Sequence, residues 1–274
     1  MNRAAKCLRL PYEYFVLYGG LLFFALMCLS WSLFATLLFP LLPQRMRTHV
    51  GQFVIMAGFR SYVLLLQASG LVKCDLRALD ALRHEGALII APNHPSLIDV
   101  VLIASRLPHI VGIMKAALWH NLMLGGGARL AGYIRNDSPT GMIRLSIAAT
   151  RKGNQLLIFP EGTRTRGQSV NAFKPGFALI AKKADAPIQT VFIETNSPFL
   201  GKAWPLFKKP VFPLRYSVRL GQRFEVKGDI KTFIAQLEQY YKQQLDTQHD
   251  CQEEPCPPTT TTHFVQHTQN QAPK

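Results

Sequence analysis

The feature that most constrains the fold of this chain is a stretch from Tyr14 to Gln44 that contains no charged side chain. Within it, the segment FVLYGGLLFFALMCLSWSLFATLLF is long enough to supply the roughly 20 apolar residues that a helix needs to cross a bilayer core. A cleaved signal peptide has a shorter apolar segment and a small-residue cleavage site, and neither is evident here. We therefore expect this stretch to form a membrane-associated helix.

Residues 46–70 predict a second, less apolar helix, because apolar side chains recur in it at helical spacing. Two arrangements fit. A spanning helix is followed by a surface helix, or two helices dip into one leaflet and return, with Gly19-Gly20 and Pro40 allowing the bend. Basic residues flank the apolar stretch on both sides, so charge does not set its orientation. In both arrangements residues 1–70 anchor the chain to membrane lipids.

From residue 71 onward, short β-rich runs alternate with helical stretches. This order is typical of an α/β fold with a mainly parallel sheet flanked by helices, in which ligands collect beyond the C-terminal ends of strands. We assign residues 71–228 to this domain, 229–246 to a C-terminal helix and 247–274 to a disordered tail. The expected strands are Val72–Leu76, Ala87–Pro92, Ile110–Lys115, Gly132–Arg135, Gln155–Phe159, Ile188–Glu194 and Tyr216–Phe224. The expected helices between them are Leu97–Arg106, Leu118–Leu130, Thr140–Lys152 and Gly176–Lys183.

The chain carries a formal charge of +15, which indicates an acidic partner such as a nucleic acid, an anionic membrane surface or a phosphorylated substrate. Residues 199–223 concentrate this charge, with six Lys or Arg residues, no acidic residue and interleaved aromatic side chains. This pattern suits either a nucleic acid or a membrane interface, where aromatic rings lie at headgroup depth. The apolar N-terminus favours the membrane, so we expect membrane lipids as partners and no nucleic acid.

The five cysteines include no C-x-x-C pair, which indicates reduced thiols and a cytosolic catalytic domain. Four residues of the tail, Cys251, Cys256, His263 and His267, are of the types that bind zinc. The loop between these pairs is too short for the usual zinc finger. We therefore expect no metal site.

The stretch APNHPSLID, which follows the apolar run ALII, contains the clearest catalytic pattern. The apolar run places His94 at the rim of the sheet, Pro95 forces a turn, and Asp99 follows in the first turn of a helix. A carboxylate bonded to one imidazole nitrogen fixes the tautomer and leaves the other nitrogen as a general base. Ser96 lies too close to His94 in the chain to complete a triad, and no G-x-S-x-G motif is present. We expect His94 to activate a hydroxyl group of the substrate.

A second motif, FPEGTRTR at residues 159–166, also follows a predicted strand. Two arginines, two hydroxyls and a flexible glycine make an anion-binding loop, in which Arg164 can bind phosphate with two hydrogen bonds. Lys115 and Arg135 end two other predicted strands and add positive charge to the same rim. Gly125-Gly126-Gly127 is not followed by G-K-[ST], so we expect a turn there and no phosphate loop.

The motif His94-x4-Asp99 after Pro92-Asn93, followed by FPEGTR, resembles the glycerolipid acyltransferase family typified by 1-acyl-sn-glycerol-3-phosphate acyltransferases. The resemblance covers about residues 70–225 and implies that family's fold and activity. It implies that His94 is the base and Asp99 its partner. The residues that it assigns to substrate binding are Lys115, Arg135, Glu161, Gly162, Thr163 and Arg164. A further block begins at Ala186-Pro187-Ile188, where Thr190 replaces the second proline of the family pattern.

By this resemblance the chain moves an acyl group from acyl-CoA or acyl carrier protein to a lysophospholipid, most often 1-acyl-sn-glycerol-3-phosphate, giving phosphatidic acid. The resemblance implies no metal and no cofactor beyond the thioester co-substrate. It also implies a catalytic domain on the cytoplasmic face of the inner membrane. Two alternatives stay open: acylation of another hydroxylated lipid, such as an amino-lipid or a specialised lipid, and a non-catalytic module that binds membranes or nucleic acid.

Overall fold

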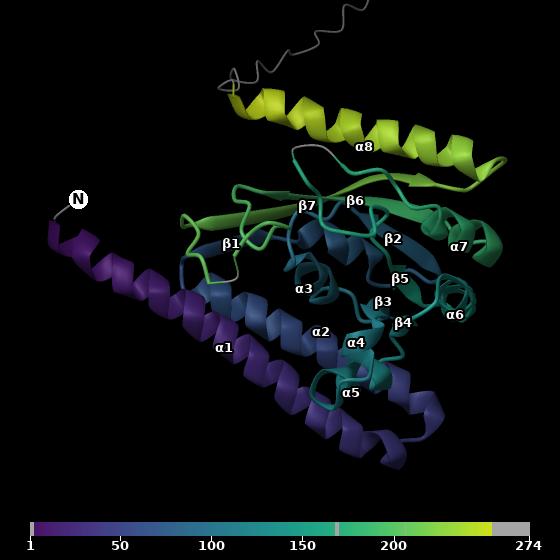
Figure 1. Ribbon diagram of the computed structural model, residues 1–274, viewed down its shortest axis with the longest axis horizontal. Helices are drawn as coiled ribbons and strands as arrows, with labels where there is room; N and C mark the ends of the chain where they lie inside the picture. The colour runs from purple at the N-terminus through teal and green to yellow at the C-terminus, as the bar shows by residue number, and fades with distance from the viewer. Residues whose placement is uncertain (1–2, 168–169, 206, 254–274) are drawn as a thin grey trace, which may run out of the picture.

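The computed structural model describes residues 3–167, 170–205 and 207–253. The chain begins with two long helices, α1 (Arg3–Leu41) and α2 (Gln44–Ala68), which precede an α/β domain (Figure 1). The strands are β1 (Val72–Asp75), β2 (Leu88–Pro92), β3 (Ile110–Lys115), β4 (Ile134–Asn136), β5 (Gln155–Leu157), β6 (Ile188–Thr195) and β7 (Leu214–Phe224). The remaining helices are the 3₁₀ helix η1 (Arg77–Leu82) and the α-helices α3 (Asp99–Ala104), α4 (Ala116–Trp119), α5 (Leu122–Leu130), α6 (Pro139–Arg151), α7 (Gly176–Ala184) and α8 (Ile230–Glu253).

All seven strands form one sheet in the order β1-β7-β6-β2-β5-β3-β4. The strands from β6 to β4 are parallel to one another, whereas β7 runs antiparallel to β6 and β1 runs parallel to β7. The C-terminal ends of β2 to β6 therefore lie at the same edge of the sheet as the N-terminal ends of β1 and β7. This confirms the predicted α/β fold with a mainly parallel sheet, and the central strand β2 is buried along its whole length, as such sheets require.

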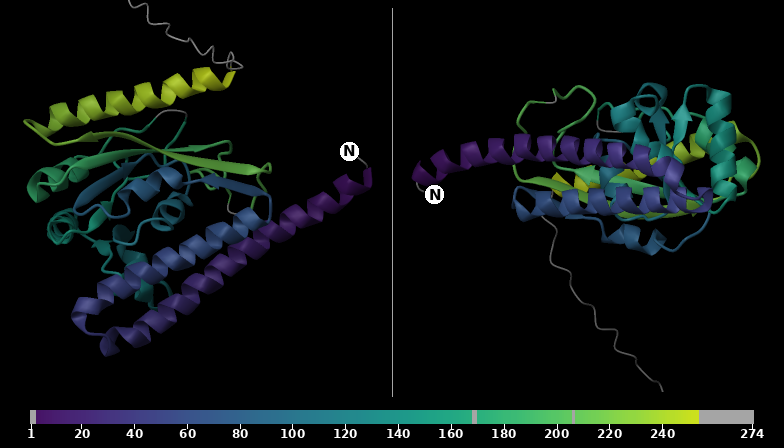
Figure 2. Two further views of the ribbon diagram at one scale, coloured as in Figure 1. Left: turned by 180° about the vertical axis from the view of Figure 1, so that it is seen from behind. Right: turned by 90° about the horizontal axis from the view of Figure 1, so that it is seen from below.

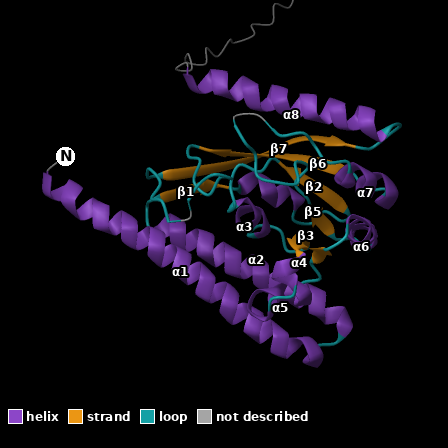
Figure 3. Ribbon diagram, viewed as in Figure 1, coloured by secondary structure: helices purple, strands orange, loops and turns teal. Residues whose placement is uncertain are grey.

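Helices cover both faces of the sheet, as the colouring by secondary structure makes clear (Figure 3). One face packs against α1, α2 and α3 through a cluster that includes Leu88, Ile90 and Leu102. The other face packs against α6, α7 and α8 through a cluster that includes Ile89 and Phe192. Because side chains alternate along β2, neighbouring residues of that one strand anchor both layers.

The helices α1 and α2 form a hairpin that lies along one side of the domain (Figure 2). Both helices are long and apolar enough to cross a membrane, judged by length and composition alone. Only 11% of the most apolar window of α1 is buried, against 33% for α2. The large apolar side chains that α1 leaves exposed include Phe15, Leu22, Phe34, Leu37 and Leu41. The hairpin therefore packs on the domain through α2 and through the contact of α1 with α5, and the rest of α1 presents an apolar surface.

The predicted helix over residues 118–130 is divided into α4 and α5, and the glycine triplet lies inside α5 and not in a turn. The physical reason is close contact between helices. A Cβ atom on Gly126 would collide with the carbonyl oxygen of Ser32, and one on Gly127 would lie 2.5 Å from Nε1 of Trp31. Gly126 and Gly127 let α5 approach α1, and Gly125 instead faces the carbonyl of Trp119 in α4. Local sequence reasoning does not reveal these contacts.

The C-terminal helix begins as predicted but continues past residue 246 to Glu253. Its Leu237 and Tyr241 are buried on the sheet, and the Tyr241 hydroxyl donates a hydrogen bond to the Ala91 carbonyl at the end of β2. The rest of the expected disordered tail, with Cys256, His263 and His267, lies outside the described residues.

The glycine contacts give a direct test of the packing between α1 and α5. Replacing Gly126 by Ala should destabilise the fold by about 1–3 kcal/mol, the usual cost of overpacking, because the new Cβ has no room against Ser32. The measurement is the midpoint of thermal unfolding in detergent.

Gly19→Ala is the matched control, since Gly19 is also helical and a Cβ at that position would meet no atom within 4 Å. This control should unfold at or above the wild-type temperature, because Ala favours helix. Equal unfolding temperatures for Gly126→Ala and Gly19→Ala would contradict the account of the α1–α5 contact.

Candidate active site

The side chain of Asn93 holds the turn after β2, because its amide makes the two hydrogen bonds to one residue of β6 that a paired strand residue would make. Its Nδ2 donates to the carbonyl of Ile193 at 3.0 Å, and its Oδ1 accepts from the Ile193 N–H at 2.7 Å. Both bonds are buried, so they fix the point where the chain leaves the sheet. The next residue, His94, is thereby held at the sheet's C-terminal edge, as predicted.

His94 and Asp99 form the expected pair. Nδ1 of His94 lies 2.9 Å from Oδ2 of Asp99, and the backbone N–H of Ser96 donates to the same oxygen at 2.8 Å. The imidazole is 12% exposed and stacks on Phe159 with 3.7 Å between ring centroids, whereas the Asp99 side chain is fully buried at the start of α3. A carboxylate that accepts from Nδ1 selects the tautomer in which Nε2 carries the free lone pair, so Nε2 is the candidate base.

Burial raises the pKa of Asp99 to about 6, because the charged carboxylate has lost its water shell. The hydrogen bond and charge of His94 oppose this shift, as does the N–H of Ser96, while the negative charge of Glu161 adds to it. The ionised form of Asp99 therefore depends on its two donors. An imidazolium at His94 is the partner that stabilises it most.

Ser96 does not act as a nucleophile in this arrangement. Its hydroxyl is fully buried and donates to the carbonyl of Phe199 at 2.8 Å. The sequence-based argument against a serine triad agrees with this geometry. Ser96 instead ties the His94 turn to the loop that follows β6.

The loop after β5 is bound to the His94 turn through Glu161, which is 1% exposed. Oε1 of Glu161 accepts from the N–H of His94 at 3.2 Å and from the hydroxyl of Thr165 at 2.7 Å. Oε2 accepts from the N–H and the Nδ2 of Asn171 at 2.9 and 2.6 Å. The Thr165 N–H in turn donates to the His94 carbonyl at 2.7 Å.

Glu161, which was expected to line a phosphate site, accepts four hydrogen bonds from the protein itself. Its carboxylate is buried and occupied by donors of the protein itself, and its charge would repel a phosphate. Glu161 positions the loop against His94.

The rest of the motif remains at the surface. Gly162 has a φ of +66°, which favours glycine, and Thr163 is half-buried. Nη1 of Arg164 donates to the carbonyls of Leu200 and Gly201 at 2.8 and 2.9 Å. Arg164 therefore links the loop after β5 to the loop after β6, beside His94.

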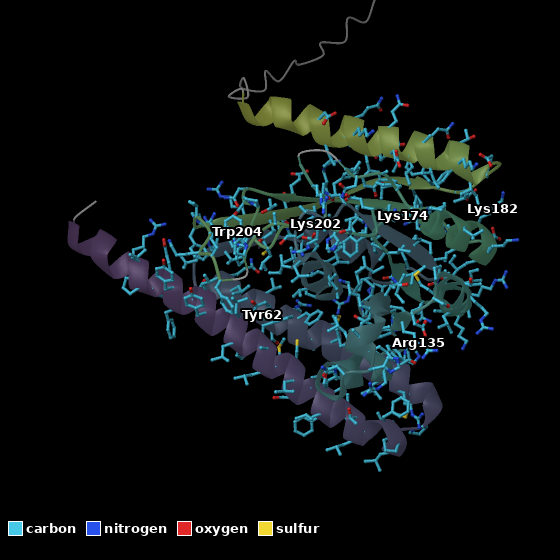
Figure 4. The ribbon with its side chains drawn as sticks, viewed as in Figure 1. Tyr62, Arg135, Lys174, Lys182, Lys202 and Trp204 are labelled. Atoms are coloured by element: carbon cyan, nitrogen blue, oxygen red, sulfur yellow. The ribbon has the colours of Figure 1, made fainter. Side chains whose placement is uncertain are left out.

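Lys115 and Arg135 lie at the same edge of the sheet but further along it. Lys115 ends β3, which lies two strands away from β2 in the sheet. Arg135 belongs to β4, which lies three strands away from β2. Arg135 is exposed and forms an ion pair with Asp137 at 2.9 Å, and Figure 4 places it beside β4, far from Trp204. Within residues 3–167, 170–205 and 207–253, no hydrogen bond or ion pair joins either cation to His94.

Three residues of the site were not assigned a role from the sequence. Asn93 belongs to the quoted motif, and its position directly before the histidine is the signal that could have drawn attention to it. Phe159 precedes Pro160-Glu161 in a similar way, whereas Asn171 lies outside every motif, and nothing in the sequence indicated a role for it.

Thr190, which replaces a family proline, lies inside β6, where its hydroxyl donates to the carbonyl of Gln222 at 2.7 Å.

Among the described residues, no group of three or more His, Cys, Asp or Glu side chains is arranged to hold a metal ion. The fold and the site are those of an α/β domain in which a histidine paired with a buried carboxylate lies at the end of a central parallel strand. Comparisons with known proteins narrow this class.

The family model described as Acyltransferase matches residues 73–194, which include His94, Asp99 and the loop after β5. The chain is 25% identical to a 1-acyl-sn-glycerol-3-phosphate acyltransferase of Pseudomonas aeruginosa over 227 residues, which is 80% of this chain and 85% of the relative. It is 30% identical to a lyso-ornithine lipid O-acyltransferase of the same organism over 121 residues, or 40% of this chain and 46% of that protein.

Among solved structures, the crystal structure of the 1-acyl-sn-glycerophosphate (LPA) acyltransferase PlsC from Thermotoga maritima shares the fold. The TM-score is 0.59 at 17% identity, and the match covers 91% of this chain and 98% of that one. These matches confirm the resemblance to acyltransferases that the two motifs indicated, and they show that the chain is an enzyme.

The buried pair predicts a defined pH response. Below a pH of about 6 the Asp99 carboxyl binds a proton, since its pKa is raised to about 6, and it no longer stabilises a charged imidazole. We expect kcat/KM of acyl transfer to fall as the pH decreases through this region. Asp99→Asn should lower kcat at pH 7.5 by about 10²–10⁴-fold, the usual scale for a general-base effect.

The measurement is the pH–rate profile of wild type and Asp99→Asn with the same substrates. Circular dichroism at each pH is the control for folding. A variant with the wild-type rate and the wild-type profile would contradict the proposed role of Asp99.

Proposed function

We propose that this acyltransferase moves a fatty acyl group from an acyl thioester to the free hydroxyl of 1-acyl-sn-glycerol-3-phosphate, giving phosphatidic acid. The observation that carries the proposal is the His94–Asp99 pair beside an arginine-bearing loop at the open edge of the sheet. The names of the relatives from Pseudomonas aeruginosa and Thermotoga maritima support a lysophosphatidic acid acceptor.

The chemistry requires one base and no covalent intermediate. Nε2 of His94 takes the proton of the acceptor hydroxyl while the oxygen of that hydroxyl attacks the carbonyl carbon of the thioester. The C–S bond then breaks, and the thiolate recovers the proton from Nε2. Asp99 stabilises the imidazolium between these steps, since it accepts from Nδ1–H. No cofactor is needed beyond the acyl thioester.

The acceptor phosphate is bound, in this proposal, by the loop after β5. Arg164 uses only Nη1 for its two carbonyl partners, which holds its guanidinium in place. Gly162 brings the backbone close, and Thr163 adds a hydroxyl. Lys115 and Arg135 lie two and three strands away, so they act through their charge at the same sheet edge.

The hairpin of α1 and α2 brings this site to the bilayer. Since α2 packs on α3, α5 and β1 and α1 packs on α5, neither helix is surrounded by lipid on all sides, and the exposed apolar side chains of α1 make the main contact with the bilayer. This favours the arrangement in which the hairpin dips into one leaflet. A small apolar cavity of about 40 Å³ between the hairpin and the catalytic turn is lined by Leu17, Tyr62 and Ile98, among others. Ile98 is the neighbour of Asp99, so this apolar cavity lies between the hairpin and the start of α3.

We place the catalytic domain on the cytoplasmic face of the cell membrane, where both types of thioester donor are made available. The free thiols of Cys28 and Cys74 suit a reducing compartment.

A second acceptor class belongs in the test. The relative that is named a lyso-ornithine lipid O-acyltransferase acts, by its name, on an amino-lipid. Such an acceptor has a hydroxyl but no phosphate, so it would depend on His94 and Asp99 and be indifferent to Arg164.

The test is to incubate the purified full-length protein with a panel of lyso-lipids and with acyl-CoA or acyl carrier protein, and to identify products by mass spectrometry. The expected product is phosphatidic acid. If only an amino-lipid is acylated, the proposed acceptor 1-acyl-sn-glycerol-3-phosphate is wrong and the amino-lipid takes its place. Salt-sensitive DNA binding without any acyl transfer would contradict the proposal that the protein is an acyltransferase.

Arg164→Ala should raise the KM for 1-acyl-sn-glycerol-3-phosphate by about tenfold or more, since a charge-assisted bond to phosphate contributes about 1.5–3 kcal/mol. Its kcat should change less. Arg166→Ala, in the same loop, is a comparison variant, and a lyso-ornithine lipid, which has no phosphate, is the comparison acceptor. An unchanged KM for the phosphorylated acceptor would contradict the assignment.

A further inference from the structure

A large open groove adjoins the catalytic turn on the side of β1 and β7. Its volume is about 1610 Å³, and it lies where β6 ends and where β1 and β7 begin. Asn93 and Pro95, on either side of His94, line it together with Thr165, which binds the His94 carbonyl. The groove therefore adjoins the turn that holds His94, although the His94 side chain is not part of its lining.

The groove is strongly basic. The cations that line it are Lys73, Arg166, Lys202, Lys208 and Arg215, and its aromatic residues are Trp204 and Tyr216. Across the described chain, none of these five cations forms an ion pair with a carboxylate. We call this region the basic groove.

The two acidic side chains that line the basic groove are already neutralised. Asp75 forms an ion pair with Arg77 at 2.7 Å, and Glu194 forms one with Arg219 at 3.0 Å. The positive charge of the groove is therefore available to a ligand. Five cations around one hollow, none of them paired with a carboxylate among the described residues, favour the binding of an anion there.

Trp204 adds a fixed aromatic surface to this charge. Its indole N–H donates to the carbonyl of Lys208 at 3.0 Å, and its ring packs edge-on against Phe199 with 6.1 Å between centroids. Figure 4 shows Trp204 and Lys202 in the same part of the molecule, near β1 and β7. Lys202, Trp204, Lys208 and Arg215 lie beyond residues 73–194, the part that the family model matches.

We propose that the basic groove binds the 3′-phosphorylated adenosine diphosphate of a coenzyme A thioester and so directs its acyl carbonyl to His94. This inference rests on the proposed function and specifies the donor. Several phosphate charges complement the five cations, and a concave site with an aromatic residue fits a nucleotide. An acidic carrier protein, by contrast, would need a docking surface and not a hollow.

The test is steady-state kinetics of the full-length protein with acyl-CoA, using Lys202→Glu, Arg215→Glu and the double variant. We expect the KM for acyl-CoA to rise by about tenfold for each single variant, which corresponds to about 1.4 kcal/mol. The KM for the acceptor and kcat should stay within about twofold. Adenosine 3′,5′-bisphosphate should inhibit wild type in competition with acyl-CoA and inhibit the double variant more weakly.

Lys182→Glu is the matched control, because Lys182 is an exposed lysine of α7 outside the groove and visible apart from Lys202 in Figure 4. It should leave the KM for acyl-CoA unchanged. An unchanged KM in the double variant, or an increase confined to the acceptor or to acyl carrier protein, would overturn the proposal.

Direct binding separates this inference from the proposed function. Calorimetric titration with free coenzyme A needs no acyl transfer, so it remains informative if no acceptor in the panel is acylated. Binding to wild type and Lys182→Glu that is weakened in the double variant supports the groove, and equal binding by all three proteins overturns it.

Discussion

The active site depends on one buried carboxylate. Asp99 is taken fully out of water, at a cost that raises its pKa to about 6, and it is retained because His94 and the Ser96 N–H donate to it. The same bond aims the imidazole and selects the nitrogen that can act as a base. The burial of the Asp99 carboxylate destabilises the fold, and its hydrogen bond orients the His94 imidazole for catalysis. Strongly perturbed pKa values of this kind are common at functional sites.

A second carboxylate, Glu161, organises the surroundings of this pair. It joins the histidine turn, the loop after β5 and Asn171 through hydrogen bonds that its two oxygens accept. Arg164 and Ser96 then join these loops to the loop after β6. Residues from three separate segments are held around one imidazole, while the glycine-lined contact between α1 and α5 holds the apolar hairpin against the same domain.

Much of this could be predicted from the sequence, because it depends on neighbours in the chain. The apolar run before His94, the proline after it and the carboxylate one helical turn later are local features, and the structure has them as expected. The strand Ile110–Lys115 was placed correctly for the same reason.

What could not be predicted depends on contacts between distant segments. The glycine triplet has the local appearance of a turn, and only the approach of α1 explains why it is helical. Glu161 resembles a ligand-binding residue until its partner Asn171 is seen. The reversed direction of β7 follows from pairing with β6 and β1, which no single stretch encodes.

The central claim is that His94 is the base that activates the acceptor. Its most direct test is the rate of acyl transfer by His94→Ala, measured with wild-type protein under the same conditions and with co-sedimentation on vesicles as a check of membrane attachment. The account predicts that the variant still binds vesicles but forms product at least about 10²-fold more slowly. A variant that sediments normally and acylates the acceptor at the wild-type rate would contradict it.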